Sequence, residues 1–508
     1  MSNHEPIDPR NREAEVGSKT VGSQRQADSN DEACSTNIRQ STELSETCSE
    51  NTRKPTNHNE IQAANIQQPT DLSEAGAADL RKPTASPERF RRQAVTPEEA
   101  CSRILAHVKT LESEDVPLAD AWRRSAARSI AAPHSYPPFR RSGMDGYAVR
   151  AADLPADGDT SSTAELEVLE SLQAGTVPTK AVGPGQASRI MTGGMMPEGA
   201  DTVVMLEMTS ASVRDGISYV RISKHVPTGR NVSGIGSELQ AGETLIEEGR
   251  IIEAGETALL AAFGFTSVPV ARRPRVGILS TGSELLDIGD PLEPGRIRNS
   301  NAPMLSVLVR EVGAEPVLLG RVPDRADEAE KVIRDGMANC DLLLTTGGVS
   351  VGDSDILVDI LARWEGRTLF NKIAMRPGSP TTAALLNGKL LLALSGNPGA
   401  CFVGFHLFAA PAIRTMLHHG NPAPAFFQAR LEEHFPKINA YPRYVRSRTE
   451  VRDGVIWVQP AGEDQSGLMT TIACADSLML IPPLKEELRE GDIVTVIPLK
   501  PGIGGNRG

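Results

Sequence analysis

The chain has 508 residues, 39% of them hydrophobic and only 4% aromatic, with 45 glycines, 36 prolines and a formal net charge of −12. This length suits roughly three or four soluble domains, and the many glycines and prolines predict frequent turns. The negative charge argues against nonspecific nucleic-acid binding, because a phosphate backbone would repel the protein. An anionic ligand would have to be held by local basic groups, backbone amides or a metal ion.

Neither export nor a membrane span is predicted. The longest apolar run, Cys401 to Ile413, is too short for a span and contains His406 and Pro411, so we expect a buried helix there. The N-terminus lacks the basic and then apolar pattern of a signal peptide. The six cysteines show no C-x-x-C spacing, which predicts reduced thiols in a cytoplasmic protein, without a disulfide framework or a zinc site.

Residues 1–88 form a polar, low-complexity segment rich in Ser, Thr, Asn, Gln, Glu, Asp and Pro. Such a composition cannot bury enough apolar surface to offset the entropy lost on ordering, so we expect a disordered tail. The segment contains a weak duplication, because Arg53-Lys54-Pro55-Thr56 recurs as Arg81-Lys82-Pro83-Thr84, 28 positions on. The units lack a hydrophobic face, which favours a duplicated linker over a solenoid.

Folded structure is predicted to begin near Thr96, which precedes a proline and two glutamates in the pattern of a helix N-terminus with a capping box. We expect residues 89–131 and 243–273 to form a helical linking domain, with a helix from Glu253 to Phe263. Between them, residues 132–242 show short β segments separated by glycine and proline, which predict a β-rich domain.

Residues 274–422 alternate strand and helix patterns, which predict a doubly wound, mainly parallel α/β domain. The expected strands are Val276 to Ser280, Pro316 to Leu319, Leu342 to Thr346, Thr368 to Ile373 and a hairpin from Thr382 to Leu394 turned by Asn387-Gly388. The expected helices start at Asn301, Asp324, Asp355 and Ala400. Residues 423–508 are β-rich again and predict a compact barrel or sandwich. The expected fold class is therefore α/β plus β, in several domains.

A glycine-rich loop follows the apolar strand Leu342 to Thr346 and carries Gly347, Gly348, Asp353 and Asp355. Parallel sheets bind ligands at the carboxyl ends of their strands, where paired glycines let backbone N–H groups approach an anion. The two carboxylates are the kind of oxygen ligand that holds Mg²⁺ against a phosphate. For this loop taken alone, a tight turn with an aspartate capping the next helix is the alternative.

Three further loops of this character end strands of the same segment: Ser280 to Glu284, Arg376 to Pro380, and Ser395 to Gly399. Four such loops at one sheet edge favour a binding crevice over unrelated turns. Lys372 and Arg376 would supply positive charge there. None of the loops is the GxGxxG fingerprint or the P-loop, so a nucleotide would have to bind by another mode.

A second polar cluster, in the β-rich segment, comprises the runs Met144 to Ala148 and Arg189 to Gly193. Asp145, in the first run, could simply cap a turn. Together with the four loops, however, these runs stand in the order expected of the molybdopterin molybdenumtransferases, the molybdenum insertases also called MoeA and related to the gephyrin E domain. The chain resembles that family from about Phe90 to its C-terminus.

The resemblance implies a four-domain homodimer whose α/β domain binds adenylylated molybdopterin. Such an enzyme inserts molybdate into the dithiolene and releases AMP in a Mg²⁺-dependent step. The glycine loops would hold the pterin and phosphates, and Mg²⁺ would polarise the phosphoanhydride. Molybdate, a dianion, needs cationic and hydroxyl donors. Molybdopterin adenylyltransferase and molybdoenzymes are candidate protein partners; nucleic acid and membranes are not.

Carried over position by position, the resemblance implies functional roles for Asp145, Thr192, Glu284, Asp324 and Asp355. Asp355 and Glu284 are the expected metal ligands, and Asp145 and Thr192 would reach the active site of the partner subunit. The loops and the resemblance together give the expected substrate-binding residues, which are Gly347, Gly348, Ser350, Lys372, Arg376, Ser379, Asn397, Pro398, Glu238, Arg446 and Ser466.

The chain departs from the family pattern at four of these or neighbouring positions. Glu238 stands where many members carry aspartate, so the charge is kept and its reach is longer. Arg376 and Ser379 replace the lysines of a Lys-Pro-Gly-Lys run, and Ser395 replaces the first proline of Pro-Gly-Asn-Pro. These departures bear on the molybdate contacts more than on the overall reaction.

Two other functions are compatible with parts of the sequence. An enzyme that adenylylates molybdopterin with ATP shares the α/β fold, but it is usually a single small domain, and the flanking β segments argue against it. A non-catalytic assembly scaffold is the other, as the gephyrin E domain partly is. The presence of Asp145, Glu284 and Asp355 favours catalysis, because a scaffold would not need carboxylates in the crevice.

Overall fold

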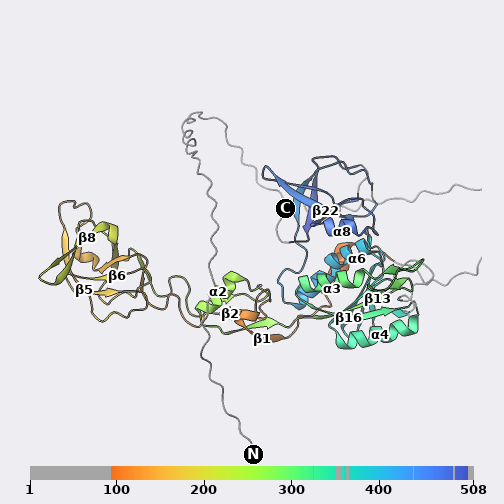
Figure 1. Cartoon of the computed structure of the whole chain (residues 1–508), viewed down its shortest axis with the longest axis horizontal. Helices are drawn as coiled ribbons and strands as arrows, with labels where there is room; N and C mark the ends of the chain where they lie inside the picture. Colours follow the sequence, from red (N-terminus) through yellow and green to blue (C-terminus); the bar gives the residue numbers. More distant parts are fainter. Residues whose placement is uncertain are drawn as a thin grey trace, which may run out of the picture. The chain divides into compact units, whose positions relative to one another are not determined.

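Figure 1 shows a computed structural model of the chain. The structure describes residues 93–323, 325–348, 365–438, 440–483 and 487–500, together with Leu357, Ile360 and Leu361. The tail expected for residues 1–88 lies outside the described residues. The same holds for most of the helix expected to begin at Asp355.

Helix α1 (Pro97–Leu105) opens the described chain and packs on the α/β sheet. Thr96 caps it by accepting a hydrogen bond from the N–H of Glu99 at 3.1 Å. The reciprocal half of the expected capping box is not made, because the Glu99 carboxylate pairs with Arg103 instead. Arg103 also donates to the carbonyl of Leu369, 266 residues further along the chain, at 2.8 Å. The start of the fold is therefore tied to a strand from its later half.

The segments expected to form a helical linking domain contain short strands as well as helices. Strand β1 (Ser113–Pro117) pairs antiparallel with β12 (Ser267–Ala271), and β2 (Ile130–Ala131) pairs with β11 (Thr244–Ile246). Helix α2 (Ala254–Ala262) begins with a complete capping box between Glu253 and Glu256. The sequence indicated the helices and missed the strands, since strands this short carry too few residues to show an alternating pattern.

The β-rich segment folds into a six-stranded sheet of order β7-β4-β6-β5-β9-β8 (Figure 1). Its strands are β4 (Gly146–Val149), β5 (Ala164–Leu172), β6 (Gln186–Ile190), β7 (Thr202–Met205), β8 (Thr209–Arg214) and β9 (Ile217–Ile222). A separate short pair joins β3 (Arg141–Ser142) to β10 (Val232–Ser233). The antiparallel register of β4 and β6 sets Tyr147 opposite Arg189. This register brings together the two runs that the sequence singled out.

The α/β segment contains a six-stranded sheet of order β16-β13-β17-β20-β19-β18. The strands are β13 (Arg275–Thr281), β16 (Glu315–Val322), β17 (Leu342–Thr346), β18 (Arg367–Phe370), β19 (Thr382–Leu386) and β20 (Lys389–Leu394), and a short parallel pair joins β14 (Leu285–Leu286) to β15 (Ile297–Arg298). The first four strands in the order are parallel, and β19 and β18 add an antiparallel edge. Asn387 and Gly388 both have positive φ in the β19–β20 turn, as expected of an Asn-Gly hairpin.

Helices cover both faces of this sheet, with α3 (Asn301–Glu311) and α4 (Ala326–Asn339) on opposite sides (Figure 1). Alternate leucines of β17 explain the arrangement. Leu342 and Leu344 belong to the core beneath α3, whereas Leu343 packs in the core beneath α4. All three are fully buried, and burying one leucine stabilises the fold by about 1.5–3 kcal/mol.

A long apolar helix continues from the end of β20. It runs through α6 (Pro398–Gly404), a π-helical turn η4 (Phe405–Ala409) and α7 (Ala410–Met416). By length and composition, the 19 residues from Pro398 to Met416 could cross a membrane, but 83% of their most apolar window is buried inside the protein. Among the described residues this is therefore a core helix of the α/β unit, as the sequence predicted.

The C-terminal segment closes into a barrel of order β21-β23-β22-β24-β25, which decides between the barrel and the sandwich. The strands are β21 (Phe427–Leu431), β22 (Arg443–Arg452), β23 (Val455–Pro460), β24 (Ser477–Ile481) and β25 (Ile493–Pro498), with the short helix α8 (Thr470–Cys474) between β23 and β24. The predicted fold class, α/β plus β in several parts, is confirmed. Short 3₁₀ turns complete the description at η1 (Leu118–Asp120), η2 (Ala151–Asp153) and η3 (Leu206–Met208).

Candidate active site

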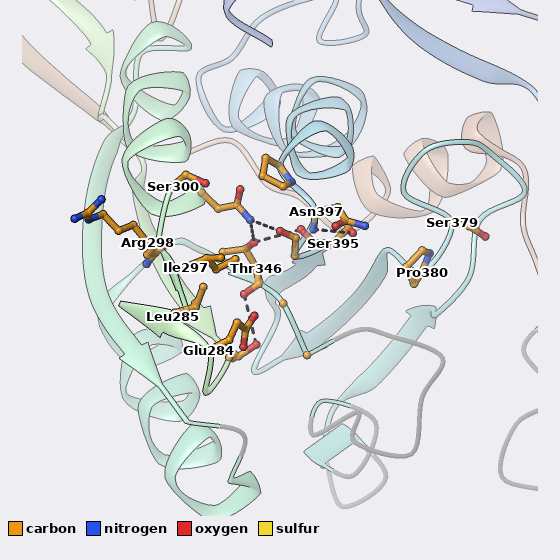
Figure 2. A pocket seen from close by; sticks show the side chains of 18 of the residues that line it. Glu284, Leu285, Ile297, Arg298, Ser300, Thr346, Ser379, Pro380, Ser395 and Asn397 are labelled. Atoms are coloured by element: carbon orange, nitrogen blue, oxygen red, sulfur yellow. Dashed lines mark hydrogen bonds between the residues drawn. The ribbon is translucent and has the colours of Figure 1, made fainter. Parts of the chain in front are cut away.

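A cavity of about 660 Å³ opens at the carboxyl ends of β13, β17 and β20 (Figure 2). Its lining residues are Thr281, Gly282, Glu284, Leu285, Ile297, Arg298, Asn299, Ser300, Asn301, Thr346, Gly347, Gly348, Lys372, Ser379, Pro380, Ser395, Gly396, Asn397 and Pro398. In Figure 2, Glu284 and Leu285 lie on one side, Ser379 and Pro380 lie on the other, and Thr346 and Ser395 lie between them. All four predicted loops contribute, so the structure brings them together as the sequence suggested.

Glycines let two strand-end loops touch at the floor of the cavity. Gly347 has a φ of +91°, and a Cβ there would lie 2.2 Å from the carbonyl oxygen of Thr281. A Cβ on Gly396 would meet the Cα of Gly347 at 3.4 Å. A side chain at Gly347 would force the loops apart, so the backbone can line the cavity only because these residues have none.

Glu284 is held in place through the backbone around it. The N–H of Ile297 donates to the carbonyl of Glu284 at 2.9 Å, as part of the β14–β15 pairing. The guanidinium groups of Arg296 and Arg321 both donate to the carbonyl of Leu285, at 3.2 Å and 2.9 Å. Among the described residues of the lining, Glu284 supplies the carboxylate, so it is the group there that is suited to bind a hard cation.

A hydrogen-bond network fixes the inner wall. The side-chain amide of Asn301 donates to the Thr346 hydroxyl at 2.7 Å and to the Gly396 carbonyl at 2.8 Å. The Thr346 hydroxyl can donate onward to the carbonyl of Ser395 at 3.3 Å. The thiol of Cys401 lies beneath, where burial raises its pKa to about 12, so it is not a nucleophile at neutral pH.

The sequence did not predict the part of the lining formed by Ile297 to Asn301. These residues follow no glycine-rich strand end, and their polarity looks like an ordinary entry into helix α3. The available signal was the dense polar run Asn299-Ser300-Asn301 directly before a predicted helix, in a segment whose other strand ends already pointed to one sheet edge.

Lys372, Ser379 and Arg376, which were predicted to bind substrate, differ in their position relative to the cavity. Lys372 lines the cavity, and its backbone carbonyl accepts a hydrogen bond from the N–H of Val95 at 3.1 Å. Ser379 also lines the cavity, but its hydroxyl donates to the carbonyl of Ile373 at 2.8 Å. Arg376 is exposed and is not among the lining residues; its backbone pairs with the C-terminal barrel instead. A molybdate contact by Arg376 stays a prediction.

The barrel meets the cavity rim at Asn397, which donates to the Ser466 hydroxyl at 3.4 Å. The N–H of Gly399 donates to the carbonyl of Ser466 at 2.9 Å. Arg446 is buried close by, because a Cβ on Gly399 would lie 2.3 Å from its Nη1 atom. Burial lowers the pKa of Arg446, and Nη1 has no hydrogen-bond partner within the described part of the chain. The two predicted barrel residues thus adjoin the cavity without lining it.

Asp145 and Thr192 are brought together in the β-rich sheet, away from the residues that line the cavity. The N–H and the hydroxyl of Thr192 both donate to Asp145, at 2.7 Å and 2.8 Å. These two bonds, the backbone one first, lower the pKa of the exposed Asp145 carboxyl. Glu238 is likewise exposed, and it lies 3.9 Å from Arg141. It does not line the cavity either.

Asp324, Ser350 and Asp355 lie outside the described residues, so their predicted roles remain predictions. Within the described ranges, no group of three or more His, Cys, Asp or Glu side chains is arranged to hold a metal ion. Among the described lining residues, Glu284 is the carboxylate that could bind a divalent ion.

Three family models match the chain in succession. The MoeA N-terminal region, described as domains I and II, matches residues 95–264. A probable molybdopterin binding domain matches residues 277–415, and the MoeA C-terminal region, domain IV, matches residues 428–499. The second match contains the entire cavity lining.

Whole relatives agree with this order. The chain is 43% identical over 410 residues to the molybdopterin molybdenumtransferase of Bacillus subtilis, covering 81% of this chain and 95% of the relative. It is 37% identical to the Staphylococcus epidermidis enzyme of the same name, covering 80% and 96%. A crystal structure of a molybdopterin biosynthesis MoeA protein from Pyrococcus horikoshii has 29% sequence identity and a TM-score of 0.69, covering 80% of this chain and 100% of that one. The chain belongs to the molybdopterin molybdenumtransferase (MoeA) family.

Proposed function

We propose that this protein inserts molybdate into adenylylated molybdopterin and releases AMP, which yields the molybdenum cofactor. The observation that carries the proposal is the shared cavity, in which glycines of two strand-end loops, Glu284 and Lys372 line one space. Relatives that cover most of the chain carry the name of this transferase, which supports the same reaction.

The cavity suits a substrate made of a pterin and a nucleotide joined by phosphates. Its volume of about 660 Å³ is within the usual range for small-molecule sites, roughly 300–1,000 Å³. Backbone N–H groups of the loops at Gly348 and Gly396 would bind phosphate oxygens, since the contact between loops that Gly347 permits brings these strand ends to one space. Lys372 would add a positive charge, which the net-negative chain must supply locally.

The donors fit a Mg²⁺ ion that is held largely by the substrate. Glu284 would bind it directly, with Asp355 as the second carboxylate expected from the sequence. Mg²⁺ commonly takes one or two carboxylates together with substrate phosphates. When bound, the ion would supply Lewis-acid polarisation of the phosphoanhydride. Glu284 keeps its position through the bonds of Arg296 and Arg321 to the neighbouring carbonyl of Leu285.

Molybdate would bind at the end of the cavity nearest the barrel. The buried Nη1 group of Arg446, which has no partner among the described residues, and the hydroxyl of Ser466 adjoin this end of the cavity. A doubly charged oxyanion is bound best by such charge-assisted donors. Ser350 would add a hydroxyl, and Ser379 would do so once its hydroxyl leaves the carbonyl of Ile373. Arg376 would add the charge that a lysine carries in the commoner family pattern.

The test is AMP release. Purified protein given adenylylated molybdopterin, molybdate and Mg²⁺ should release AMP at a rate that depends on both added ions. Glu284→Gln should lower this rate about 100-fold, because it removes the carboxylate that binds the cation. Glu311→Gln, on the exposed end of α3, serves as the control and should leave the rate unchanged. Normal nucleotide binding without AMP release by the unaltered protein would disprove the proposal.

We further propose that the protein works as a cytoplasmic homodimer in which Asp145 and Thr192 of one subunit complete the cavity of the other. Their exposed position outside the lining of their own chain supports this arrangement. Asp145→Asn and Glu284→Gln subunits, each inactive alone, should recover roughly a quarter of the normal rate when mixed dimers form at random. Light scattering should give a dimer mass, and a monomer that is fully active would exclude this arrangement.

A further inference from the structure

One loop of the barrel, residues 461–469, touches the cavity rim next to Asn397. The carbonyl of Ser466 accepts the N–H of Gly399 at 2.9 Å, and the Ser300 hydroxyl lies 3.8 Å from the sulfur of Met469. The loop therefore contacts two sides of the cavity rim. The interactions that fix the conformation of this loop also fix the position of Ser466.

Asp464 is the buried anchor of this loop. Its side chain is only 7% exposed and pairs with Arg443, while the Lys437 ammonium lies 3.5 Å from the same carboxylate oxygen. Lys437 also donates to the backbone carbonyl of Asp464 at 3.0 Å. The side chain and the main chain of Asp464 are thus both held, and removing one partner of such a buried pair takes a compensating charge away from the other.

Arg443 connects this anchor to a second predicted substrate-binding segment. Arg443 forms a β-bridge with Arg376, the N–H of Tyr444 donates to the Arg376 carbonyl at 2.8 Å, and the N–H of Arg376 donates to the Pro442 carbonyl at 3.0 Å. The two neighbours of Arg443 in the chain, Pro442 and Tyr444, are therefore both bonded to Arg376, in the loop that carries Ser379.

The same anchor orients Arg446. The Nη2 group of Arg446 donates at 2.7 Å to the carbonyl of Gln465, the residue next to Asp464. The Nε group donates to the Thr471 hydroxyl at 2.8 Å. With these two groups engaged, the direction of the remaining Nη1 group depends on where the carbonyl of Gln465 stands.

We propose that Asp464 is a positioning residue for the oxyanion: through Arg443 it sets the loop that presents Ser466 and aims Arg446, and so determines the affinity for molybdate. This inference rests on the proposed function. Asp464 does not line the cavity, so its removal should change molybdate affinity and leave the chemical step intact.

Electrostatics alone predicts the opposite result. Asp464 is an anion near the molybdate end, so replacing it with a neutral residue would remove a repulsion and leave two cations there. Asp464→Asn would then bind molybdate more tightly. If positioning dominates, the same variant binds molybdate more weakly, since misplaced donors lose their hydrogen bonds. The sign of the change separates the two explanations.

The measurement is the molybdate dependence of AMP release by the full chain, together with titration calorimetry with molybdate. Asp464→Asn should raise the KM and the Kd for molybdate about tenfold, with kcat at saturating molybdate within about twofold of normal, because only binding is lost. The matched control is Asp341→Asn, which breaks the half-buried pair with Arg272 at the opposite end of β17. This control should lower stability but leave the molybdate KM unchanged.

An unchanged or tighter molybdate affinity in Asp464→Asn would overturn the inference. If that variant does not fold, the double variant Arg443→Gln with Asp464→Asn serves as the test, because it removes both charges of the pair together. It should also weaken molybdate binding about tenfold, and affinity equal to that of the unaltered protein would overturn the inference. Absence of AMP release by the unaltered protein would instead count against the proposed function, while the calorimetric comparison would still test Asp464.

Discussion

At the scale of single residues, the cavity depends on where side chains are missing. The loops after β13 and β17 come into contact because Gly347 carries no Cβ, and the carbonyl of Thr281 occupies the space where one would lie. The loop glycine therefore has a steric role in addition to its positive φ. These two roles can be separated by experiment, since the chain has another glycine with a similar φ and open space around it.

Gly347→Ala should destabilise the fold far more than Gly388→Ala. Gly388, in the β19–β20 hairpin, has a φ of +77°, and no atom lies within 4 Å of the place that a Cβ would take, so alanine there should cost only the backbone term, about 1 kcal/mol. Gly347→Ala adds a clash and should cost about 3 kcal/mol or more. Urea unfolding of both variants measures the difference, and equal costs would show that the two loops can separate freely.

Sequence reasoning located the cavity residues that sit on glycine-rich strand ends. Glu284, Gly347 and Lys372 line the cavity as expected, because the end of a parallel strand has a fixed place at the sheet edge. It missed Asn301, whose amide joins two loops that lie 45 and 95 residues further along the chain. Such a role depends on tertiary contacts that no local pattern encodes. Arg376 has the expected charge, but its backbone is bonded to the barrel.

At the scale of elements, the strands and helices of the α/β unit were the most predictable part. Strand β17 has the expected bounds, Leu342 to Thr346, since three consecutive leucines leave little choice for a strand that is buried on both faces. The helix expected to start at Ala400 is real, but its middle is a π-helical turn. The apolar pattern does not indicate this turn, because nearly all residues of the segment are apolar and buried.

This helix should make the protein sensitive to acid. His406 packs edge-on against Phe402 and Phe405, and its Nε2 atom is buried without a partner in the described structure. Burial, and next the charge of Arg414, lower the pKa of His406 to about 3. The unfolded chain would bind a proton near pH 6.5 while the folded chain would not, so stability is retained above this pH and lost as the pH falls toward 3.

His406→Leu should therefore reduce the slope of unfolding free energy against pH between about 6 and 4, by about 1.4 kcal/mol per pH unit. Urea unfolding at a series of pH values measures this slope. The control is His434→Gln, which alters an exposed histidine paired with Glu487 and should leave the slope of the buried group in place. An unaltered slope in His406→Leu would mean that His406 is protonated in the folded protein.

At the scale of the whole molecule, the described fold begins almost as soon as the predicted tail ends. Val95 forms a parallel bridge with Ile373, and its N–H and carbonyl bond to Lys372 and Ala374 at 3.1 Å and 2.7 Å. One of these partners, Lys372, lines the cavity. The few residues between the tail and α1 therefore help to support the cavity.

Removal of residues 1–88 should leave AMP release within about twofold of normal, because a polar linker contributes no packing. Removal of residues 1–98 should lower the rate at least about tenfold, since it takes away Val95 and the Thr96 cap and so frees the backbone of Lys372. Both truncations are compared by AMP release and thermal unfolding. Equal activity of the two would place the start of the functional fold after residue 98.

The bond between Arg103 and Leu369 also limits when helix α1 can complete its native contacts during synthesis of the chain. Its partners are 266 residues apart, and a ribosome adding about 5–20 residues per second needs roughly 15–50 s to cover that distance. Ala100 and Ile104 of helix α1 are fully buried in the finished fold. Until strand β18 has been made, this part of their final packing is missing. The first helix of the described chain thus completes its contacts only after β18 has been made, and its apolar residues are open to aggregation until then.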